Sequence, residues 1–362
     1  MIRRDILVIG GGPSGLCAAI AAAKSGATVL LVERSKYLGG QLVKQTHMFF
    51  GSEKQYASKR GIDIGKTLAE EVTSHENIKI LTDTTALGIY EDGVVTLEQR
   101  KNQEEIYIKV RPKSIIVGTG ALEKSLPFPN NDLPGIYGAG AVQTLMNEYL
   151  VKPGNRVLMV GAGNIGLIIS YQLLQAGVEV AGIIDASSNI GGYLVHASKI
   201  RRSGVPILTG YTIVKAEGEN HLEKATIAKV DQNWKPIPGT EKEMDVDVIC
   251  ISVGLTPSSA FFWQGGCDME YVRELGGYVP KRNKYLQTTV ENIYVAGDSA
   301  GIEEASSAMV EGSIAGLAAS HDLGLVYEAY DQEMEELLQE LQALRGGEKG
   351  GHVRKGYEKA GL

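Results

Sequence analysis

The feature that most constrains this chain is a glycine-rich turn between an apolar strand and a helix at its start. Residues 5–10 are typical of a buried strand, the turn follows as Gly10-Gly-Gly12-Pro13-Ser14-Gly15, and residues 16–24 predict a helix. In a GxGxxG turn the first glycine permits the tight turn, the second lets the backbone approach a pyrophosphate, and the third lets the helix pack on the strand. A second strand, 27–33, ends in Glu33, 18 residues after Gly15, where a carboxylate can accept hydrogen bonds from a ribose diol. The pattern predicts a dinucleotide site; the alternative is a glycine-rich α/β turn that binds no cofactor.

The same pattern occurs again in the middle of the chain. Residues 156–160 predict a buried strand, which leads into Gly161-Ala-Gly163-Asn164-Ile165-Gly166 and a helix through residue 175. The next strand ends in Asp185, 19 residues after Gly166. Residues 127–140 are rich in Pro, Gly, Asn and Asp and predict a linker between the two repeats. We therefore expect an α/β protein with two Rossmann-like, three-layer dinucleotide-binding domains.

Two further glycine turns follow predicted buried strands. Residues 113–117 lead into Gly118-Thr119-Gly120, and residues 293–296 lead into Gly297-Asp298 and a small-residue helix that starts near Ser306. Asp298 stands at the carboxyl end of its strand, the usual ligand position in open α/β sheets. Between the first glycine turn and Gly118, short strands near 78–81, 86–90, 94–97 and 106–110 predict an antiparallel interruption, with the next strand starting at 113.

Composition narrows the class of protein. A length of 362 residues suits two buried cores, and a net charge of −7 argues against nucleic acid and anionic membranes as partners. No apolar run approaches the roughly 20 residues of a membrane span, and the first strand begins too early for a signal peptide. The three cysteines are widely spaced and form neither a disulfide framework nor a zinc pattern. We expect a cytoplasmic protein without a bound metal.

Together, the four glycine motifs resemble those of two-domain flavoproteins of the pyridine nucleotide–disulfide oxidoreductase type, nearest in size to thioredoxin reductase. The resemblance implies that an NAD domain is inserted into an FAD domain. It places the FAD-binding domain at 1–120 and 246–325 and the NAD(P)-binding domain at 121–245. Residues 326–362 would form a C-terminal helix and tail.

The resemblance also implies the cofactor-binding residues. Glu33 would bind the adenosine ribose of FAD, Asp298 would lie at the ribityl and phosphate end, and the helix near Ser306 would point its N-terminus at the flavin. Such a helix end stabilises negative charge on the flavin ring. The positions implied in the first domain are Gly10, Gly12, Pro13, Ser14, Gly15, Glu33, Arg34, Gly40, Gln41, Leu42, Thr119, Gly120, Gly297, Asp298, Ser306 and Ser307. The others are Gly161, Gly163, Asn164, Ile165, Gly166, Asp185 and Gly254.

The chain departs from this family where a disulfide reductase needs its cysteines. Thioredoxin reductases carry a CxxC just before the second dinucleotide motif, and this chain has 139-AGAVQT-144 there. Glutathione reductase relatives carry a cysteine pair after the Gly-Gly turn, where this chain has 41-QLVKQ-45. Thiol–disulfide exchange needs an attacking thiolate and a resolving thiol. The sequence therefore predicts an electron acceptor other than a disulfide.

The cysteine-free segment 133-LPGIYGAGA-141 is similar to one in the α subunits of heteromeric amine and imino-acid dehydrogenases. These include dye-linked proline dehydrogenase, sarcosine oxidase, opine oxidase and hydrogen cyanide synthase. The resemblance implies an oligomer in which a catalytic flavoprotein partner subunit oxidises the amine. Several such relatives carry a cysteine-rich segment for a 2Fe–2S cluster that this sequence lacks, so a cluster would belong to a separate iron–sulfur subunit. The alternative is a non-catalytic scaffold that holds FAD and an adenine nucleotide for its partner.

For several individual residues the sequence allows more than one role. Asp185 is expected to select NAD(H) over NADP(H) by repelling a 2′-phosphate, although it could be a solvated loop residue. Another adenine nucleotide, such as ATP, could also fill this second site. Lys44 and His47, in the polar segment placed beside the flavin, are candidates for a stabilising cation and a proton donor. Their alternative is to line a surface or an interface.

The C-terminal segment has an apolar seam with helical spacing. The seam consists of Tyr327, Tyr330, Met334, Leu337, Leu341 and Leu344, and a glycine-rich tail follows from residue 345. A single seam on an acidic helix is typical of a surface that packs against another element. We expect this helix to help hold a partner; the alternative is a helix packed on its own domain with a frayed tail.

Overall fold

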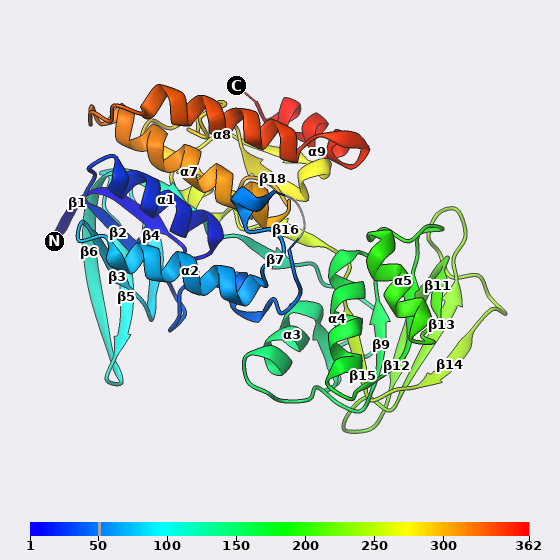
Figure 1. Cartoon of the computed structure of the whole chain (residues 1–362). Coiled ribbons are helices and arrows are strands. Elements are labelled where there is room, and N and C mark those ends of the chain that lie inside the picture. Colours follow the sequence, from blue (N-terminus) through cyan, green and yellow to red (C-terminus); the bar gives the residue numbers. More distant parts are fainter. Residues whose placement is uncertain (50–51, 362) are drawn as a thin grey trace. The chain divides into compact units, whose positions relative to one another are not determined.

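The computed structural model describes residues 1–49 and 52–361, and their contacts divide the chain into two compact units. The first unit contains residues 1–122 and 256–362, and the second contains residues 123–255. The second unit is thus inserted into the first (Figure 1). The chain passes between them along β7 (Ala121–Glu123) and β16 (Leu255–Pro257). Within the described residues, no helix has both the length and the apolar composition needed to span a membrane.

The first unit is built on a parallel sheet in the order β3-β2-β1-β6, with β19 on the other side of β6. These strands are fully or largely apolar where they pair, because both faces of the sheet are covered. Their bounds are β1 (Ile2–Ile9), β2 (Val29–Val32), β3 (Ile78–Leu81), β6 (Glu104–Val117) and β19 (Ile293–Val295).

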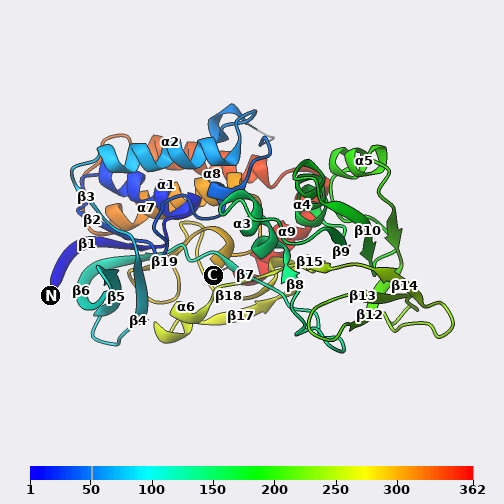
Figure 2. The ribbon, with the colours of Figure 1, turned by 90° about the horizontal axis from the view of Figure 1, so that it is seen from below.

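Three helices cover one face of this sheet: α1 (Pro13–Lys24), α2 (Gly61–Ser74) and α7 (Ala305–Asp322). Helices α1 and α7 lie side by side in both views (Figure 1, Figure 2). A Cβ at Gly312 would lie 2.0 Å from the carbonyl oxygen of Ser14, and one at Gly316 would lie 2.3 Å from that of Ala18. The two backbones therefore approach so closely that only glycine fits on the α7 side.

The opposite face carries β4 (Thr84–Ile89), β5 (Val95–Lys101) and α6 (Ala260–Gln264). The separate strands expected at 106–110 and 113–117 are one strand, β6, which corrects the sequence prediction. This strand pairs antiparallel with β5 up to Val110 and parallel with β1 from Val110 onward. Pro112 lies just after this exchange of partners. Smaller elements are the hairpin β17 (Met269–Val272) and β18 (Gly277–Pro280), and the 3₁₀ helices η2 (Glu53–Gln55) and η3 (Arg273–Leu275).

The second unit has its own parallel sheet, in the order β11-β10-β9-β15-β8. Helices cover one face and a three-stranded antiparallel sheet covers the other (Figure 2). The strands are β8 (Ile136–Gly138), β9 (Arg156–Val160), β10 (Glu179–Asp185), β11 (Ile207–Thr209) and β15 (Val248–Ile251). The covering elements are α3 (Ala139–Asn147), α4 (Asn164–Gln175), α5 (Leu194–Arg202), β12 (Tyr211–Glu217), β13 (Lys224–Lys229) and β14 (Lys242–Asp245).

The predicted fold class is confirmed, since each unit is a three-layer, Rossmann-like α/β structure. One boundary differs from the expectation that the chain returns to the first domain at residue 246. Strand β15 pairs with β9 and β8 of the second unit, and the chain rejoins the first unit at Thr256. A short apolar run predicts a buried strand, but it does not say which sheet the strand joins.

The C-terminal segment forms two helices of the first unit, α8 (Tyr330–Leu344) and α9 (Gly347–Ala360). Met334 and Leu341 are buried in the same core as α1 and α7, and the other seam residues pack against that core. The seam therefore packs on its own unit, as the alternative expected, and a further role of this segment in holding a partner stays a prediction. The frayed tail expected in that alternative is wrong, because the tail forms α9, whose Tyr357 and Val353 pack in one cluster with Leu275.

Candidate dinucleotide sites

The first glycine turn connects β1 to α1, and two of its glycines are required by the chain itself. Gly10 has φ +108°, and a Cβ there would lie 2.3 Å from the carbonyl oxygen of Gly118. A Cβ at Gly15 would lie 1.8 Å from the carbonyl oxygen of Gly10. Pro13 occupies the first position of α1, where its missing N–H leaves no hydrogen bond unmade.

Gly12 is different, because nothing among the described residues requires a glycine there. Its φ of −79° suits any residue, and a Cβ would have only the Cα of Gly40, at 3.9 Å, within 4 Å. The free space lies at the N-terminus of α1, where unpaired N–H groups and the helix dipole favour a phosphate. The residues present therefore fit the pyrophosphate of a dinucleotide.

Glu33 closes this site from the end of β2. Its side chain is 7% exposed, and its two oxygens accept hydrogen bonds from the N–H groups of Gly11 at 2.7 Å and Ser35 at 2.8 Å. Both contacts fix the carboxylate beside the glycine turn and leave lone pairs free to accept from ribose hydroxyls. The neighbouring Arg34 is exposed.

The second unit repeats this geometry at its own turn. Gly161 has φ +115°, and Cβ atoms at Gly161 and Gly166 would each lie 2.1 Å from a backbone oxygen. A Cβ at Gly163 would have no atom of the described residues within 4 Å. Asp185 accepts hydrogen bonds from the N–H groups of Ala162 at 2.7 Å and Ser187 at 2.8 Å. The spacing of the glycines, the open space at the middle glycine and the two backbone hydrogen bonds of the acid therefore recur in the second unit.

In each unit a second glycine pair lies against the turn. Gly39 N donates to Gly11 O at 2.7 Å, and Gly192 N donates to Ala162 O at 2.9 Å. Asn164 also accepts a hydrogen bond from Tyr193 N at 2.8 Å. Sequence reasoning identified the first pair and missed Gly192 and Tyr193. The signal was present, since Gly191-Gly192 follows Asp185 as Gly39-Gly40 follows Glu33.

The 3₁₀ helix η1 (Gly40–Lys44) follows the first of these pairs. A Cβ at Gly40 would lie 2.7 Å from the Cα of Gly12, so this segment touches the dinucleotide turn. Leu42 and Lys44 are buried, whereas Gln41 is exposed. The ring of His47 stacks on Phe49, with 5.7 Å between ring centroids.

The fourth motif reaches the same site. Gly297 begins the 3₁₀ helix η4 (Gly297–Ser299), and a Cβ there would lie 2.7 Å from Ser14 Oγ in α1. Ser306 and Ser307 are buried in the first turn of α7. The structure therefore brings the first and fourth motifs together. Gly118 N donates to Ile9 O at 2.9 Å, and the adjoining Thr119 donates to Ser258 O at 3.3 Å, with Gly120 in open space at φ +72°.

Asp298 is the electrostatically unusual residue of this site. Burial raises the pKa of its carboxyl group from 3.8 to about 7, and the nearby Glu311, Glu303 and Glu304 act in the same direction. Its one hydrogen bond from the backbone, from Glu303 N, is long at 3.4 Å. The carboxyl group is thus partly protonated near neutral pH and can donate a hydrogen bond as well as accept one.

Two further predicted positions belong to the second unit. Gly254 has φ +110° just beyond β15, and its carbonyl oxygen accepts from Lys124 N at 3.0 Å. It therefore belongs to the inserted unit. Ile165, in the first turn of α4, is 41% exposed.

The three cysteines form no redox pair. All are free thiols; burial raises the pKa of Cys17 to about 12, and burial likewise raises the pKa values of Cys250 and Cys267. A thiol reacts as its thiolate, so these environments suppress disulfide exchange. In the part of the chain that the structure describes, no group of three or more His, Cys, Asp or Glu side chains is placed to hold a metal ion.

Comparison with known proteins gives a family and a set of relatives. Residues 4–312 match the model of the family described as pyridine nucleotide-disulphide oxidoreductase. The HcnB subunit of hydrogen cyanide synthase from Pseudomonas protegens is 26% identical over 86% of this chain and 69% of its own length. An opine oxidase subunit from Agrobacterium tumefaciens is 29% identical over 89% and 66%, and the alpha subunit of sarcosine oxidase from a Corynebacterium species is 28% identical over 89% and 33%.

Solved structures show the same fold. L-proline dehydrogenase from P. horikoshii matches with a TM-score of 0.69 and 23% identity over 92% of this chain and 59% of that one. Thioredoxin reductase from T. acidophilum matches with a TM-score of 0.72 and 20% identity over 89% and 99%. This chain therefore spans about two thirds of HcnB and of the opine oxidase subunit, and a third of the sarcosine oxidase alpha subunit.

Proposed function

Since the chain belongs to the pyridine nucleotide-disulphide oxidoreductase family, we propose that it passes electrons between NAD(H) and a non-disulfide acceptor through FAD. It is an oxidoreductase-type flavoprotein related to subunits of heteromeric amine and imino-acid oxidases and dehydrogenases. The observation that carries the proposal is the repeated turn, in which Glu33 and Asp185 make the same pair of backbone contacts. Two such turns in one chain suit two dinucleotides.

FAD would be held by the first unit. The turn around Gly12 would receive the pyrophosphate, Glu33 the adenosine ribose, and Asp298 with the N-terminus of α7 the flavin end. The family implies both FAD and a pyridine nucleotide. Bound FAD would supply two-electron chemistry, taking a hydride equivalent from NADH and releasing two electrons to the next acceptor.

NAD(H) would be held by the second unit, with Asp185 accepting from the ribose 2′-hydroxyl. Residues 186–189 read Ala-Ser-Ser-Asn and offer no cation for a 2′-phosphate. A carboxylate at this position also repels that phosphate, which supports NADH over NADPH. An adenine nucleotide such as ATP shares the same ribose and is the second candidate for this site.

The acceptor would belong to a partner protein. Relatives named as subunits of hydrogen cyanide synthase, opine oxidase and sarcosine oxidase make other subunits plausible for this chain. We propose a catalytic flavoprotein that oxidises an amine or imino acid, with any iron–sulfur cluster carried by a further subunit. Lys44 and His47 remain candidates for steadying charge and supplying a proton beside the flavin. The free cysteines support an acceptor other than a disulfide.

Anaerobic mixing with NADH tests this proposal against a non-catalytic scaffold. We expect the purified chain to retain FAD and the flavin absorbance to bleach promptly on mixing. A chain that binds no FAD contradicts the flavoprotein assignment. A chain that binds FAD and ATP but is not reduced by NADH is instead a nucleotide-binding scaffold for its partner.

A further inference from the structure

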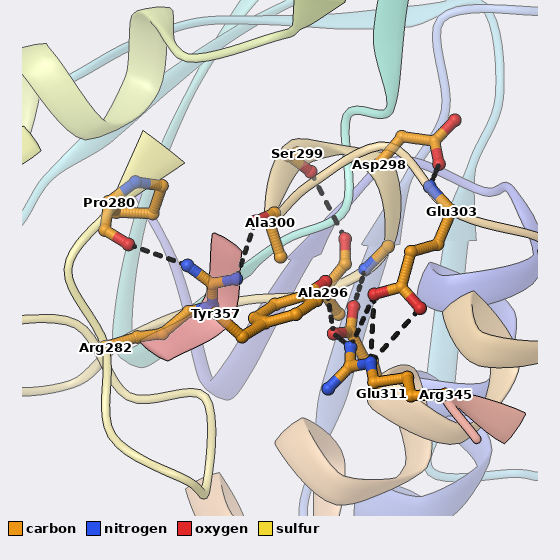
Figure 3. A network of polar contacts seen from close by, with 11 residues as sticks. Pro280, Arg282, Ala296, Asp298, Ser299, Ala300, Glu303, Glu311, Arg345 and Tyr357 are labelled. Carbon is orange, nitrogen blue, oxygen red and sulfur yellow. Dashed lines mark hydrogen bonds and ion pairs between the residues drawn. The ribbon is translucent and has the colours of Figure 1, made fainter. Parts of the chain in front are cut away.

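A buried carboxylate connects the Gly297 turn to the C-terminal helices. Glu311 lies in α7 with its side chain 2% exposed, and its Oε2 accepts a hydrogen bond from Gly297 N at 2.8 Å. Its Oε1 accepts from Arg345 Nη2, at the end of α8, and from the hydroxyl of Tyr357 in α9 at 3.1 Å. One side chain thus joins the backbone of a predicted flavin-binding turn to two helices that lie far along the chain (Figure 3).

Arg345 also binds the far end of the same loop. Its Nε donates to the two oxygens of Glu303 at 3.0 and 3.1 Å, and its Nη2 donates to Glu303 Oε1 at 2.7 Å. Glu303 precedes α7, and its own N–H donates to Asp298. The side chains of Arg345 and Glu303 are 13% and 8% exposed, so these pairs are largely shielded from water. A single guanidinium therefore holds both ends of the segment from Gly297 to α7.

A second arginine supports the middle of the loop. Arg282 is 3% exposed and donates to Ala300 O at 2.7 Å and to Pro280 O at 3.0 Å. The guanidinium groups of Arg282 and Arg345 lie 4.5 and 3.7 Å from the ring centroid of Tyr357 (Figure 3). Tyr357 therefore couples the two arginines by cation–π contacts, which strengthen where water is excluded.

We propose that Arg345 is a positioning residue of the flavin site, holding the loop 297–304 in its binding conformation through Glu303 and Glu311. The inference rests on the proposed binding of FAD by the first unit. Arg345 and Tyr357 lie beyond residue 312, where the match to the family ends, so the C-terminal helices add this clamp. A loop held in place before the ligand arrives loses less conformational freedom on binding. Without the guanidinium, the shielded carboxyl groups of Glu303 and Glu311 lose the cation hydrogen-bonded to both of them, which is destabilising even though Arg282 remains nearby.

Four variants of the full chain separate this role from general stability. Arg345→Met removes the positive charge, and Arg345→Lys keeps the charge but not the several N–H donors of the guanidinium group. Tyr357→Phe keeps the aromatic ring but removes the hydrogen bond to Glu311. Lys359→Met is the matched control, because it breaks an exposed ion pair between α9 and Glu274. Each protein is stripped of flavin and titrated with FAD, and the midpoint potential of the bound flavin is then measured.

We expect Arg345→Met to bind FAD at least about tenfold more weakly, the scale set by removing one partner of a shielded ion pair. Its midpoint potential is expected to be more negative, because the N-terminus of α7 is no longer held against the negative charge of the reduced flavin. Arg345→Lys should recover part of both losses. Tyr357→Phe should weaken binding about threefold, the low end of the range for one typical hydrogen bond. Lys359→Met should match the unchanged protein.

A folded Arg345→Met protein with unchanged FAD affinity and potential overturns the proposal. So does an equal loss in the Lys359→Met control, which would mean that any weakening of the segment has this effect. If Arg345→Met does not fold, Tyr357→Phe decides, and unchanged FAD affinity in that variant overturns the proposal. An unaltered chain that takes up no FAD instead refutes the proposed function, so the two failures are distinguishable.

Discussion

Replacing Asp298 by Asn removes a carboxyl group that the flavin-free chain holds at an energetic cost. The pKa of this group is raised from 3.8 to about 7, mainly by burial. Between these two values the unfolded chain has released the proton while the folded chain keeps it. The free energy of unfolding therefore falls as the pH rises from about 4 to about 7, and the loss is complete above that range.

The size of the effect follows from the same two values. A pKa difference of about 3, at about 1.4 kcal/mol for each tenfold change in the proton equilibrium, gives an upper limit of about 4 kcal/mol. Asp298 as a whole residue keeps some exposure to solvent, which reduces this figure, and we expect about 2 kcal/mol. Asn retains an oxygen that can accept the hydrogen bond from Glu303 N. Asp298→Asn should therefore stabilise the flavin-free chain at pH 8 by about 2 kcal/mol, with a clearly smaller gain at pH 5.5.

Urea unfolding of the flavin-free proteins at both pH values measures this difference. The chain has two tryptophans, Trp234 in the second unit and Trp263 in the first, so a Trp234→Phe background makes fluorescence report the first unit. The variant should also bind FAD more weakly, because the proposed flavin end of the site then lacks its carboxyl group. An Asp298→Asn gain that is equal at pH 5.5 and 8, or a loss at both, would refute the reasoning.

Other substitutions test the turns, the second site and the C-terminal seam. Gly12→Ala should change the free energy of unfolding by no more than about 0.5 kcal/mol but abolish tight FAD binding. Gly15→Ala should prevent folding, because its Cβ would lie 1.8 Å from a backbone oxygen. Equal stability of the two variants in a denaturant titration would contradict this expectation. Asp185→Ala should lower the NADH preference over NADPH by about tenfold, a loss of about 1.4 kcal/mol, and steady-state rates that already favour NADPH in the unaltered chain would contradict the assignment. Leu341 is 6% exposed, so Leu341→Ala should destabilise the isolated chain by about 2–4 kcal/mol in a denaturant titration. Glu335→Ala, at an exposed position of the same helix, is the control. An unchanged unfolding midpoint for Leu341→Ala would mean that the seam serves a partner instead.

The parts of the fold that could be predicted from the sequence are those with local spacing. Glycines at fixed intervals after an apolar strand, and an acid 18 or 19 residues beyond, specify each turn within one stretch of chain. The Glu311–Arg345 pair has no such spacing, since its members are 34 residues apart and each looks like an ordinary surface charge. Burial of a charge pair depends on tertiary packing, which leaves no periodic signal. The clamp could therefore be found only in the structure.

The glycine-rich tail shows how packing overrides local preference. Four glycines in Gly347–Ala360 argue against a helix, because each costs up to about 1 kcal/mol relative to alanine. In the structure, a Cβ at Gly356 would lie 2.8 Å from the side chain of Leu275, so this glycine permits the close approach of α9. Tyr357, next to it, then reaches the arginines of the clamp. Glycine, which disfavours a helix by its local preference, is thus the residue that lets α9 pack against the first unit.

The two turns also differ in a way that only their contacts explain. Both acids accept a hydrogen bond from the residue after the first glycine, which is Gly11 in one unit and Ala162 in the other. A Cβ at Gly11 would lie 2.8 Å from Leu38 Cδ2, 3.0 Å from the Cβ of Glu33 and 3.2 Å from its Oε2, so Leu38 and Glu33 together occupy the space that a methyl group needs. Asp185 is shorter by one methylene, and the methyl group of Ala162 is accommodated and fully buried. The residue after the first glycine thus depends on the side chains packed against the turn, although a motif search treats these positions as independent.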